Sequence, residues 1–227
     1  MNQQTVILLL SALSVGVIHT LLGPDHYLPF IVLARARGWS ITKTVIITTL
    51  CGIGHVLSAV LLGVVAISIG ITLGKLDFIE TFRGEIAAWL LIGFGFTYFV
   101  WSVHAVIRKK YGHFHVHADC TAHTHLPEKK SLKELTPWIL FIIFVLGPCE
   151  PLIPLVMYPA IQKSLINVFL VTLVFGLGTL FVMLFMVVTS TYYAEKASKL
   201  PFFERYGNML AGGIICGCGL AIKFLGV

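Results

Sequence analysis

Long apolar stretches alternate with short polar segments along the whole chain of 227 residues. A helix needs about 20 mostly apolar residues to cross the hydrocarbon core of a bilayer, and the usual range is about 17–25. Stretches that meet or approach this length occupy residues 6–22, 44–74, 86–107, 137–160, 164–191 and 207–223. The pattern therefore predicts an all-α polytopic membrane protein with six transmembrane helices.

One short phrase occurs twice, each time inside apolar sequence. Leu-Gly-Pro-Asp-His at residues 22–26 reappears as Leu-Gly-Pro-Cys-Glu at residues 146–150, at an offset of 124 residues. Because glycine and proline interrupt regular helix, each copy predicts a broken helix, the first and the fourth of the six. Two glycine motifs match at the same offset: residues 52–54 with 176–178, and residues 93–95 with 217–219.

These matches divide the chain into two related halves. We expect a first three-helix repeat at residues 1–111, a polar linker at residues 112–125 and a second three-helix repeat at residues 126–227. Because three is an odd number, the second half enters the membrane from the opposite side. The expected fold is therefore a 3+3 inverted repeat with broken helices 1 and 4, an arrangement typical of secondary transporters.

Composition and charge agree with this topology. Hydrophobic residues make up 57% of the chain and charged residues 11%, against about 25% charged residues in soluble domains. Of the 16 lysine and arginine residues, 12 fall in the first, third and fifth loops. The positive-inside rule then places these loops in the cytoplasm and both termini outside. No basic stripe with interleaved aromatic residues indicates nucleic-acid binding. The N-terminal stretch lacks a basic n-region and a cleavage site, so we expect an uncleaved first helix.

Potential metal ligands gather at the two breaks. A charge at the bilayer centre costs at least about 2.5 kcal/mol, so acidic residues there usually face a cavity and serve a function. Only Asp25 and Glu150 of the ten acidic residues fall beside a break, and we expect the other eight in loops or at helix ends. Imidazole and carboxylate together suit divalent ions such as nickel, cobalt, zinc or iron. The predicted metal ligands are His19, Asp25, His26, His55, Cys149 and Glu150.

Each of these residues also has a structural interpretation. Asp25 and Glu150 fit interfacial caps of re-entrant turns. His55 lies among small residues, where it fits either a hydrogen-bonded packing role or a ligand role. Cys149 fits a small buried hydrophobic residue as well as a ligand. Thr179, which aligns with His55 in the second half, offers only a hydroxyl group.

The predicted linker is rich in metal-binding side chains. Their spacing is irregular for a folded zinc finger, and the composition is typical of a flexible metal-binding tract, although it also fits a solvated connector. We expect auxiliary capture of ions on the cytoplasmic face through His113, His115, His117, Asp119, Cys120, His123 and His125.

His19 followed by Asp25-His26 resembles the signature of the nickel/cobalt transporter superfamily, and Gly54-His55 resembles its second motif. The histidine-rich linker is similar to that of bacterial nickel/cobalt efflux proteins. The duplicated Gly-Pro phrase also resembles urease-accessory-like membrane proteins, the sulfite-exporter-like group and the six-helix cytochrome c biogenesis electron carriers. The resemblance implies a small six-helix transporter in a prokaryotic plasma membrane.

Our leading hypothesis is a secondary transporter, not an enzyme, for a divalent transition-metal ion, with nickel or cobalt first and zinc or iron as further candidates. The ion is the substrate, and we expect no permanently bound cofactor. The expected partners are the lipid bilayer and either further copies of the chain or a metal-delivery protein. Proton exchange at Asp25 or Glu150 is expected to accompany transport, since metal ligands must be deprotonated.

Two other functions belong to different classes. A transmembrane thiol-disulfide electron carrier needs one cysteine in each repeat, but Asp25 stands where the partner of Cys149 is expected. An anion exporter of the sulfite type would use the positive N-terminal ends of half-helices. It is disfavoured because the two acidic residues would repel an anion and because no arginine or lysine is expected near either break.

Overall fold

The computed structural model describes residues 3–69, 73–111, 130–149, 151–162, 164–197 and 201–225. These residues form helices and short connections, and none of them lies in a β-strand. The elements are α1 (Gln3–Leu22), η1 (Pro24–His26), α2 (Leu28–Arg37), α3 (Ile41–Ser68), α4 (Leu73–Tyr111), α5 (Lys130–Leu146), α6 (Leu152–Ile161), α7 (Leu165–Ala197) and α8 (Pro201–Leu225). The all-α fold predicted from the apolar pattern is confirmed.

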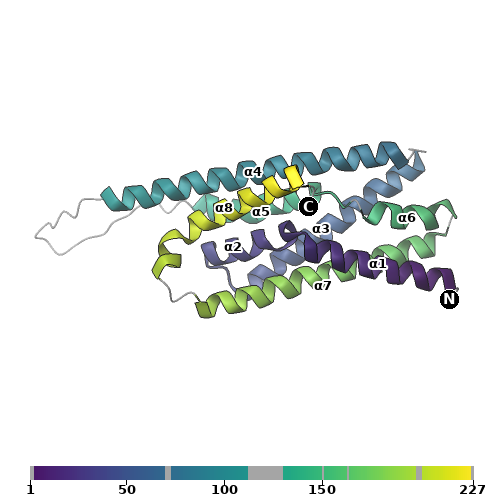
Figure 1. The fold of residues 1–227 in the computed structure, drawn as a ribbon, viewed down its shortest axis with the longest axis horizontal. Helices are drawn as coiled ribbons and strands as arrows, with labels where there is room; N and C mark the ends of the chain where they lie inside the picture. The colour runs from purple at the N-terminus through teal and green to yellow at the C-terminus, as the bar shows by residue number, and fades with distance from the viewer. Residues whose placement is uncertain are drawn as a thin grey trace, which may run out of the picture.

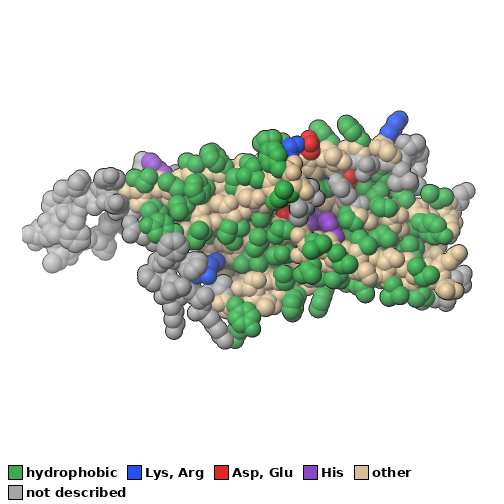
Figure 2. Space-filling view, in the orientation of Figure 1, with side chains coloured by type: hydrophobic (Ala, Val, Ile, Leu, Met, Phe, Trp, Pro, Cys, Tyr) green, Lys and Arg blue, Asp and Glu red, His purple; other side chains and the backbone are tan. Residues whose placement is uncertain are grey.

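Five helices within the described ranges are long and apolar enough to cross a membrane: α1, α3, α4, α7 and α8. The fourth predicted stretch is divided between two shorter apolar helices, α5 and α6, on either side of the second Gly-Pro phrase. Large apolar side chains lie exposed along the outside of the bundle, as Figure 2 shows for one face. Such a surface requires lipid around it, so the chain is an integral membrane protein.

The first predicted helix continues beyond its break. The sequence pattern placed residues 35–43 in a loop, whereas α2 runs to Arg37 and ends at Gly38, which adopts the left-handed conformation with φ of 61°. A proline lies in the first turn of each new piece, Pro24 in η1 and Pro29 in α2. Proline is favoured at these positions because the N–H that it lacks has no partner within the helix.

The two halves of the chain run in opposite directions. Along the long axis of the molecule, α4 and α8 lie side by side with opposite polarity, and the pairs α1/α5 and α3/α7 are also oppositely directed (Figure 1). A Cβ atom on Gly95 would meet the backbone of Cys216, and a Cβ atom on Gly219 would meet the backbone of Ile92. Adding 124 to Ile92 and Gly95 gives Cys216 and Gly219, so the two contacts are equivalent.

A second pair of contacts follows the same rule between α3 and α7. A Cβ atom on Gly52 would meet the side chain of Leu180, and a Cβ atom on Gly176 would meet that of Val56. These four residues are again related by the offset of 124. The equivalent contacts and opposite helix directions are those of an inverted repeat with an approximate two-fold axis.

Two apolar clusters fill the interior. The first surrounds α2 with parts of α3, α4, α5, α7 and α8, and includes Phe30 and Phe144. The second joins α1, α3, α6 and α7, and includes Val56, Cys149 and Phe175. Because Phe144 and Cys149 lie on either side of Gly147 and Pro148, the break between α5 and α6 is located where the two clusters meet.

Candidate metal centre

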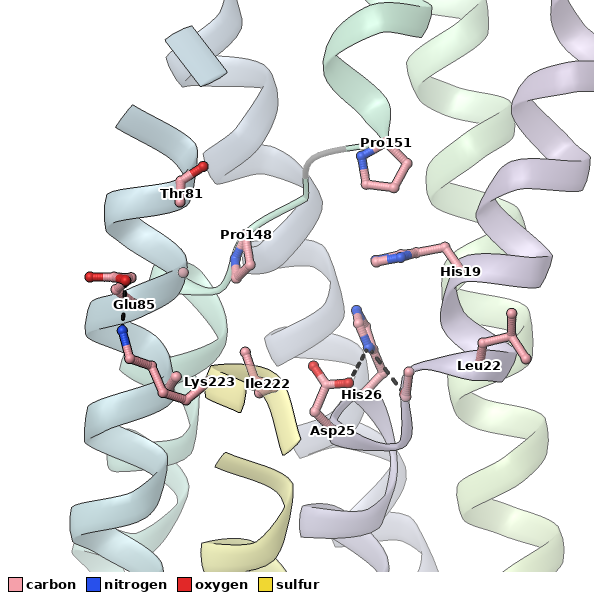
Figure 3. Close-up of a pocket in the computed structure, with 13 residues that line it drawn as sticks. His19, Leu22, Asp25, His26, Thr81, Glu85, Pro148, Pro151, Ile222 and Lys223 are labelled. Carbon is pink, nitrogen blue, oxygen red and sulfur yellow. Dashed lines mark hydrogen bonds and ion pairs between the residues drawn. The ribbon is translucent and has the colours of Figure 1, made fainter. Parts of the chain in front are cut away.

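The first break is a tight turn between α1 and α2. The N–H of Gly23 donates to the carbonyl oxygen of His19 at 2.9 Å, and the N–H of His26 donates to that of Gly23 at 3.1 Å. Residues Pro24 to His26 form a single 3-10 turn. The turn places Asp25 and His26 opposite His19, which projects from the last turn of α1 (Figure 3).

Three imidazoles from separate elements meet beside this turn. His19 comes from α1, His26 from η1 and His55 from α3. The ring centroids of His19 and His26 are 4.8 Å apart, and those of His26 and His55 are 5.3 Å apart. One nitrogen atom from each ring lies within 4.8 Å of the other two, which makes the three residues a possible metal-binding group.

Hydrogen bonds fix the tautomer of two of these rings. His55 Nδ1 lies 3.1 Å from the carbonyl oxygen of Phe144, and His26 Nδ1 lies 3.2 Å from that of Gly23. A carbonyl oxygen only accepts, so each Nδ1 carries a proton, and in the neutral ring each Nε2 then presents a lone pair. The Nε2 atoms of His19, His26 and His55 are all buried, with no hydrogen-bond partner among the described residues. Buried polar atoms are normally paired, and metal-binding histidines commonly show this arrangement.

Asp25 contacts the histidine group through the adjacent residue, His26. Its Oδ1 atom lies 3.2 Å from His26 Nδ1, so the carboxylate supports the same proton that Gly23 accepts. Carboxylates that hydrogen-bond the outer nitrogen of a ligating histidine orient the ring and raise its basicity. The arrangement therefore gives Asp25 a supporting contact to His26, and its carboxylate also lines the adjoining cavity.

Among the described residues, the second break contributes a backbone atom rather than a ligand atom to this group. The carbonyl oxygen of Phe144 accepts from His55, while Cys149 is fully buried in the second apolar cluster. Cys149 does not belong to the three-residue group found among the described side chains. Glu150 and the histidine-rich linker of residues 112–125 lie outside the described residues, so their predicted roles stay predictions.

A buried ion pair lies against the second break. Glu80, with no exposed surface, pairs with Arg83 one turn later on α4. An Arg83 Nη2 hydrogen donates to the carbonyl oxygens of Val145 at 2.9 Å and Gly147 at 3.2 Å. Glu80 Oε2 accepts from the backbone N–H of Cys149 at 3.3 Å. The pair thus occupies backbone groups that the broken helix leaves without helical partners.

This ion pair corrects two expectations from the sequence. Glu80 was expected in a loop or at a helix end, and no arginine was expected near either break. The third apolar stretch was placed at residues 86–107, but α4 begins at Leu73 and brings Glu80 and Arg83 into the interior. Their spacing of three residues, beside Phe78 and Phe82 at helical spacing, was the available signal, since residues three or four apart share a helix face.

A large cavity extends from the histidines to the outside of the bundle. Its volume is about 780 Å³, and its wall includes His19, Asp25, His26 and Pro148 (Figure 3). Glu85 and Lys223 also line it and form an ion pair of 2.6 Å. A smaller cavity of about 30 Å³ lies beside the same group and is lined by Asp25, His26 and His55. The histidines are therefore buried yet reachable.

These features define a polytopic helical membrane protein of two inverted halves, with a buried histidine group at a broken helix. The chain belongs to the family described as cytochrome c biogenesis protein transmembrane region, whose profile matches residues 29–221. The nickel/cobalt transporter superfamily is not confirmed by this match. No curated protein and no solved structure matches the chain.

The family match supports the class that the sequence analysis ranked second, a membrane protein of the cytochrome c biogenesis type. The matched span starts at residue 29, so it begins after His19 and His26. It includes His55 and the four cysteines of the described residues. Family membership therefore describes the scaffold, and the role of the histidine group must be argued from its own chemistry.

Proposed function

We propose that this protein uses the family's scaffold to move a divalent transition-metal ion across the membrane, with His19, His26 and His55 as the ligands of the ion in transit. The observation that carries the proposal is the set of three buried Nε2 atoms that have no partner among the described residues. A buried polar atom left unpaired costs about 1–3 kcal/mol. A cation shared by the three neighbouring rings would account for these atoms.

The donor set selects the class of ion. Neutral imidazole nitrogens suit nickel, cobalt, zinc and iron, whereas calcium and magnesium prefer sites made of oxygen atoms. Three protein ligands also leave coordination positions for water or for a further ligand. A transported ion needs such incomplete coordination, because it must be released as well as bound.

The surroundings of the site supply a route. The cavity of about 780 Å³ reaches the histidines from one side of the bundle, and the two broken helices meet there. Broken helices at a repeat interface are typical of transporters in which one repeat moves against the other. The chain has no nucleotide-binding motif, so we expect an ion gradient or a partner to drive transport. The lysine and arginine bias leads us to expect both termini outside.

The second candidate is a transmembrane thiol-disulfide electron carrier, and the family match favours it. Such a carrier needs two thiols that meet. Cys149 lies in the second apolar cluster, whereas Cys51 and Cys218 lie in the first. All four cysteines of the described residues, which include Cys216, are free. Among these four cysteines, the electron carrier therefore requires a rearrangement that brings a second thiol to Cys149, while Cys120 lies outside the described residues.

Transport assays in proteoliposomes separate the two candidates. Purified protein would be reconstituted with a metal-sensitive dye inside and offered nickel, cobalt, zinc, ferrous iron and manganese in turn under an imposed pH gradient. We expect saturable flux of one or two ions, its loss in His55→Ala, and its retention in Cys149→Ser and in His104→Ala, a change at an exposed histidine of α4. Absence of flux in both gradient directions from folded protein, with Cys149 trapped in a mixed disulfide, would instead establish the electron carrier.

A further inference from the structure

One guanidinium connects the two helices that determine where the His55 ring points. We propose that Arg83, held by Glu80, is a positioning residue that fixes the orientation and tautomer of His55. The inference deepens the proposed function and rests on it for the part that concerns metal binding. Arg83 itself touches none of the three imidazoles in the contacts described above, so it acts through the backbone of the second break and through α3.

The first connection runs through the end of α5. Arg83 Nη2 donates to the carbonyl oxygens of Val145 and Gly147, at 2.9 and 3.2 Å. The carbonyl of Phe144, the residue before Val145, accepts the proton of His55 Nδ1 at 3.1 Å. Adjacent peptide planes share a Cα atom, so fixing the Val145 carbonyl restricts the direction of the Phe144 carbonyl. The Phe144 carbonyl also accepts from the N–H of Gly147 at 3.1 Å, and Arg83 holds the carbonyl of that same residue. Arg83 thereby helps to determine where the acceptor of His55 lies.

The second connection runs through α3. Arg83 Nη2 lies 2.9 Å from Ser58 Oγ, and Ser58 Oγ donates to the carbonyl oxygen of His55 at 2.8 Å. Ser58 follows His55 by three residues, so it lies on the same face of the helix. The guanidinium thus contacts the turn of α3 that carries His55. It also contacts the end of α5, whose Phe144 carbonyl accepts the hydrogen bond from the His55 ring.

Glu80 makes this arrangement possible inside the bundle. An arginine without a counter-charge at this depth would be costly, and Glu80 both pairs with it and accepts from Cys149 N–H. Close packing restricts the same segment, since a Cβ atom on Gly84 would meet the ring of Pro148. The Glu80–Arg83 turn of α4 is therefore joined to the second break by both hydrogen bonds and close packing.

Arginine has a property here that lysine lacks. The guanidinium is planar, with five donors in fixed directions, whereas an ammonium group is a point charge on a flexible stem. Arg83 contacts one carboxylate, one hydroxyl and two carbonyl oxygens at once. Arg83→Lys keeps the charge and loses this geometry, so it separates positioning from simple electrostatics.

The experiment uses the full chain in nanodiscs, with histidines labelled with nitrogen-15 and the His55 signals assigned by His55→Ala. In the metal-free protein, we expect His55 to show a protonated Nδ1 and an unprotonated Nε2. Arg83→Lys should convert this to a mixture of tautomers, and Ser58→Ala should do so to a smaller extent. Arg37→Lys, the same substitution on α2 away from the second break, is the matched control and should leave the spectrum unchanged.

The second readout is cobalt(II) binding, followed by its visible absorption bands and by competition with a chelator. Loss of an outer partner of a ligating histidine typically weakens metal binding 10–100-fold, so we expect roughly a tenfold loss in Arg83→Lys with shifted bands. Wild-type His55 signals in metal-free Arg83→Lys would overturn the positioning role. A normal His55 tautomer in a wild-type protein that binds no cobalt, nickel or zinc would overturn the proposed function and leave the positioning result standing.

Discussion

The two Gly-Pro breaks share a sequence motif but are stabilised in different ways. At the first break, the backbone and the His26 ring bond within residues 19–27, so the turn is self-contained. At the second break, the carbonyl oxygens of Phe144, Val145 and Gly147 accept from side chains of other helices. The first break presents the side chain of His26 to the histidine group, and the second one is also held by side chains of α3 and α4.

This difference indicates that the two copies of a duplicated motif can have different roles. A local turn keeps its shape without distant contacts, so its side chains are free to take part in chemistry. The second break is bonded to α3 and α4, so its geometry depends on where those helices lie. We therefore expect substitutions around the second break to affect folding and coupling, and substitutions at the first break to affect ion binding.

The largest expected effect on stability comes from Arg83→Met at the second break. Removing one partner of a buried ion pair leaves the other charge uncompensated and costs about 3–5 kcal/mol. Lys223→Met removes the cation of a pair whose carboxylate, on Glu85, is 51% exposed, and such pairs contribute about 0–1 kcal/mol. Denaturation of both variants in mixed micelles, followed by circular dichroism, measures their free energies of unfolding. An equal loss of stability in the two variants would contradict the prediction.

The largest expected effect on ion binding comes from His26→Ala at the first break. Losing a ligand should exceed the roughly 10–100-fold losses seen for outer partners. The free energy of unfolding should change less than in Arg83→Met, because the substitution removes the His26 contacts to Gly23 and Asp25 without leaving a fully buried charge unpaired. Isothermal titration with nickel and cobalt tests this, beside His104→Ala as the control. Wild-type affinity in His26→Ala would remove the histidine group from the mechanism.

A smaller effect is expected from Asp25→Asn. The amide keeps the shape of the side chain but removes the negative charge beside His26 Nδ1. We expect roughly tenfold weaker binding, at the low end of the range for outer partners, with the stability of the second break unaffected. The same titration measures the loss. A complete loss of binding would instead assign Asp25 as a direct ligand.

The smallest effect on ion binding is expected from Cys149→Ser. Cys149 is buried among apolar side chains, and a hydroxyl without a good partner there costs about 1–3 kcal/mol. Ion affinity should stay close to that of the wild type, because the thiol lies outside the histidine group. A thermal shift assay and a cobalt titration report the two quantities. Complete loss of function in this variant, with folding intact, would favour the electron carrier.

The sequence was sufficient to locate the first break and its histidines, because glycine, proline and paired polar residues stand out in apolar surroundings. The convergence of His55 with His19 and His26 was less accessible, since it depends on how α3 packs against α1 and η1. The motif resemblance suggested it, and the distances between the rings establish it within the structure.

The Glu80–Arg83 pair was missed for a physical reason. Five charged residues lie between Lys75 and Glu85, and by hydropathy alone such a segment resembles a loop. Its charges become buried only because the second break leaves carbonyl and N–H groups that need partners. The sequence contains both the broken helix and the two charged residues that bond to its backbone, but it does not show that they lie beside each other in space.

The contact between α4 and α8 has a consequence for how such a chain arises. Gly95 meets Cys216 as Gly219 meets Ile92, so each half presents the same surface to the other. A self-complementary surface of this kind is isologous, the type by which two identical subunits form a dimer. A three-helix chain with this surface, inserted in both orientations, would be able to pair with itself, and the present chain holds the equivalent antiparallel pair within one polypeptide.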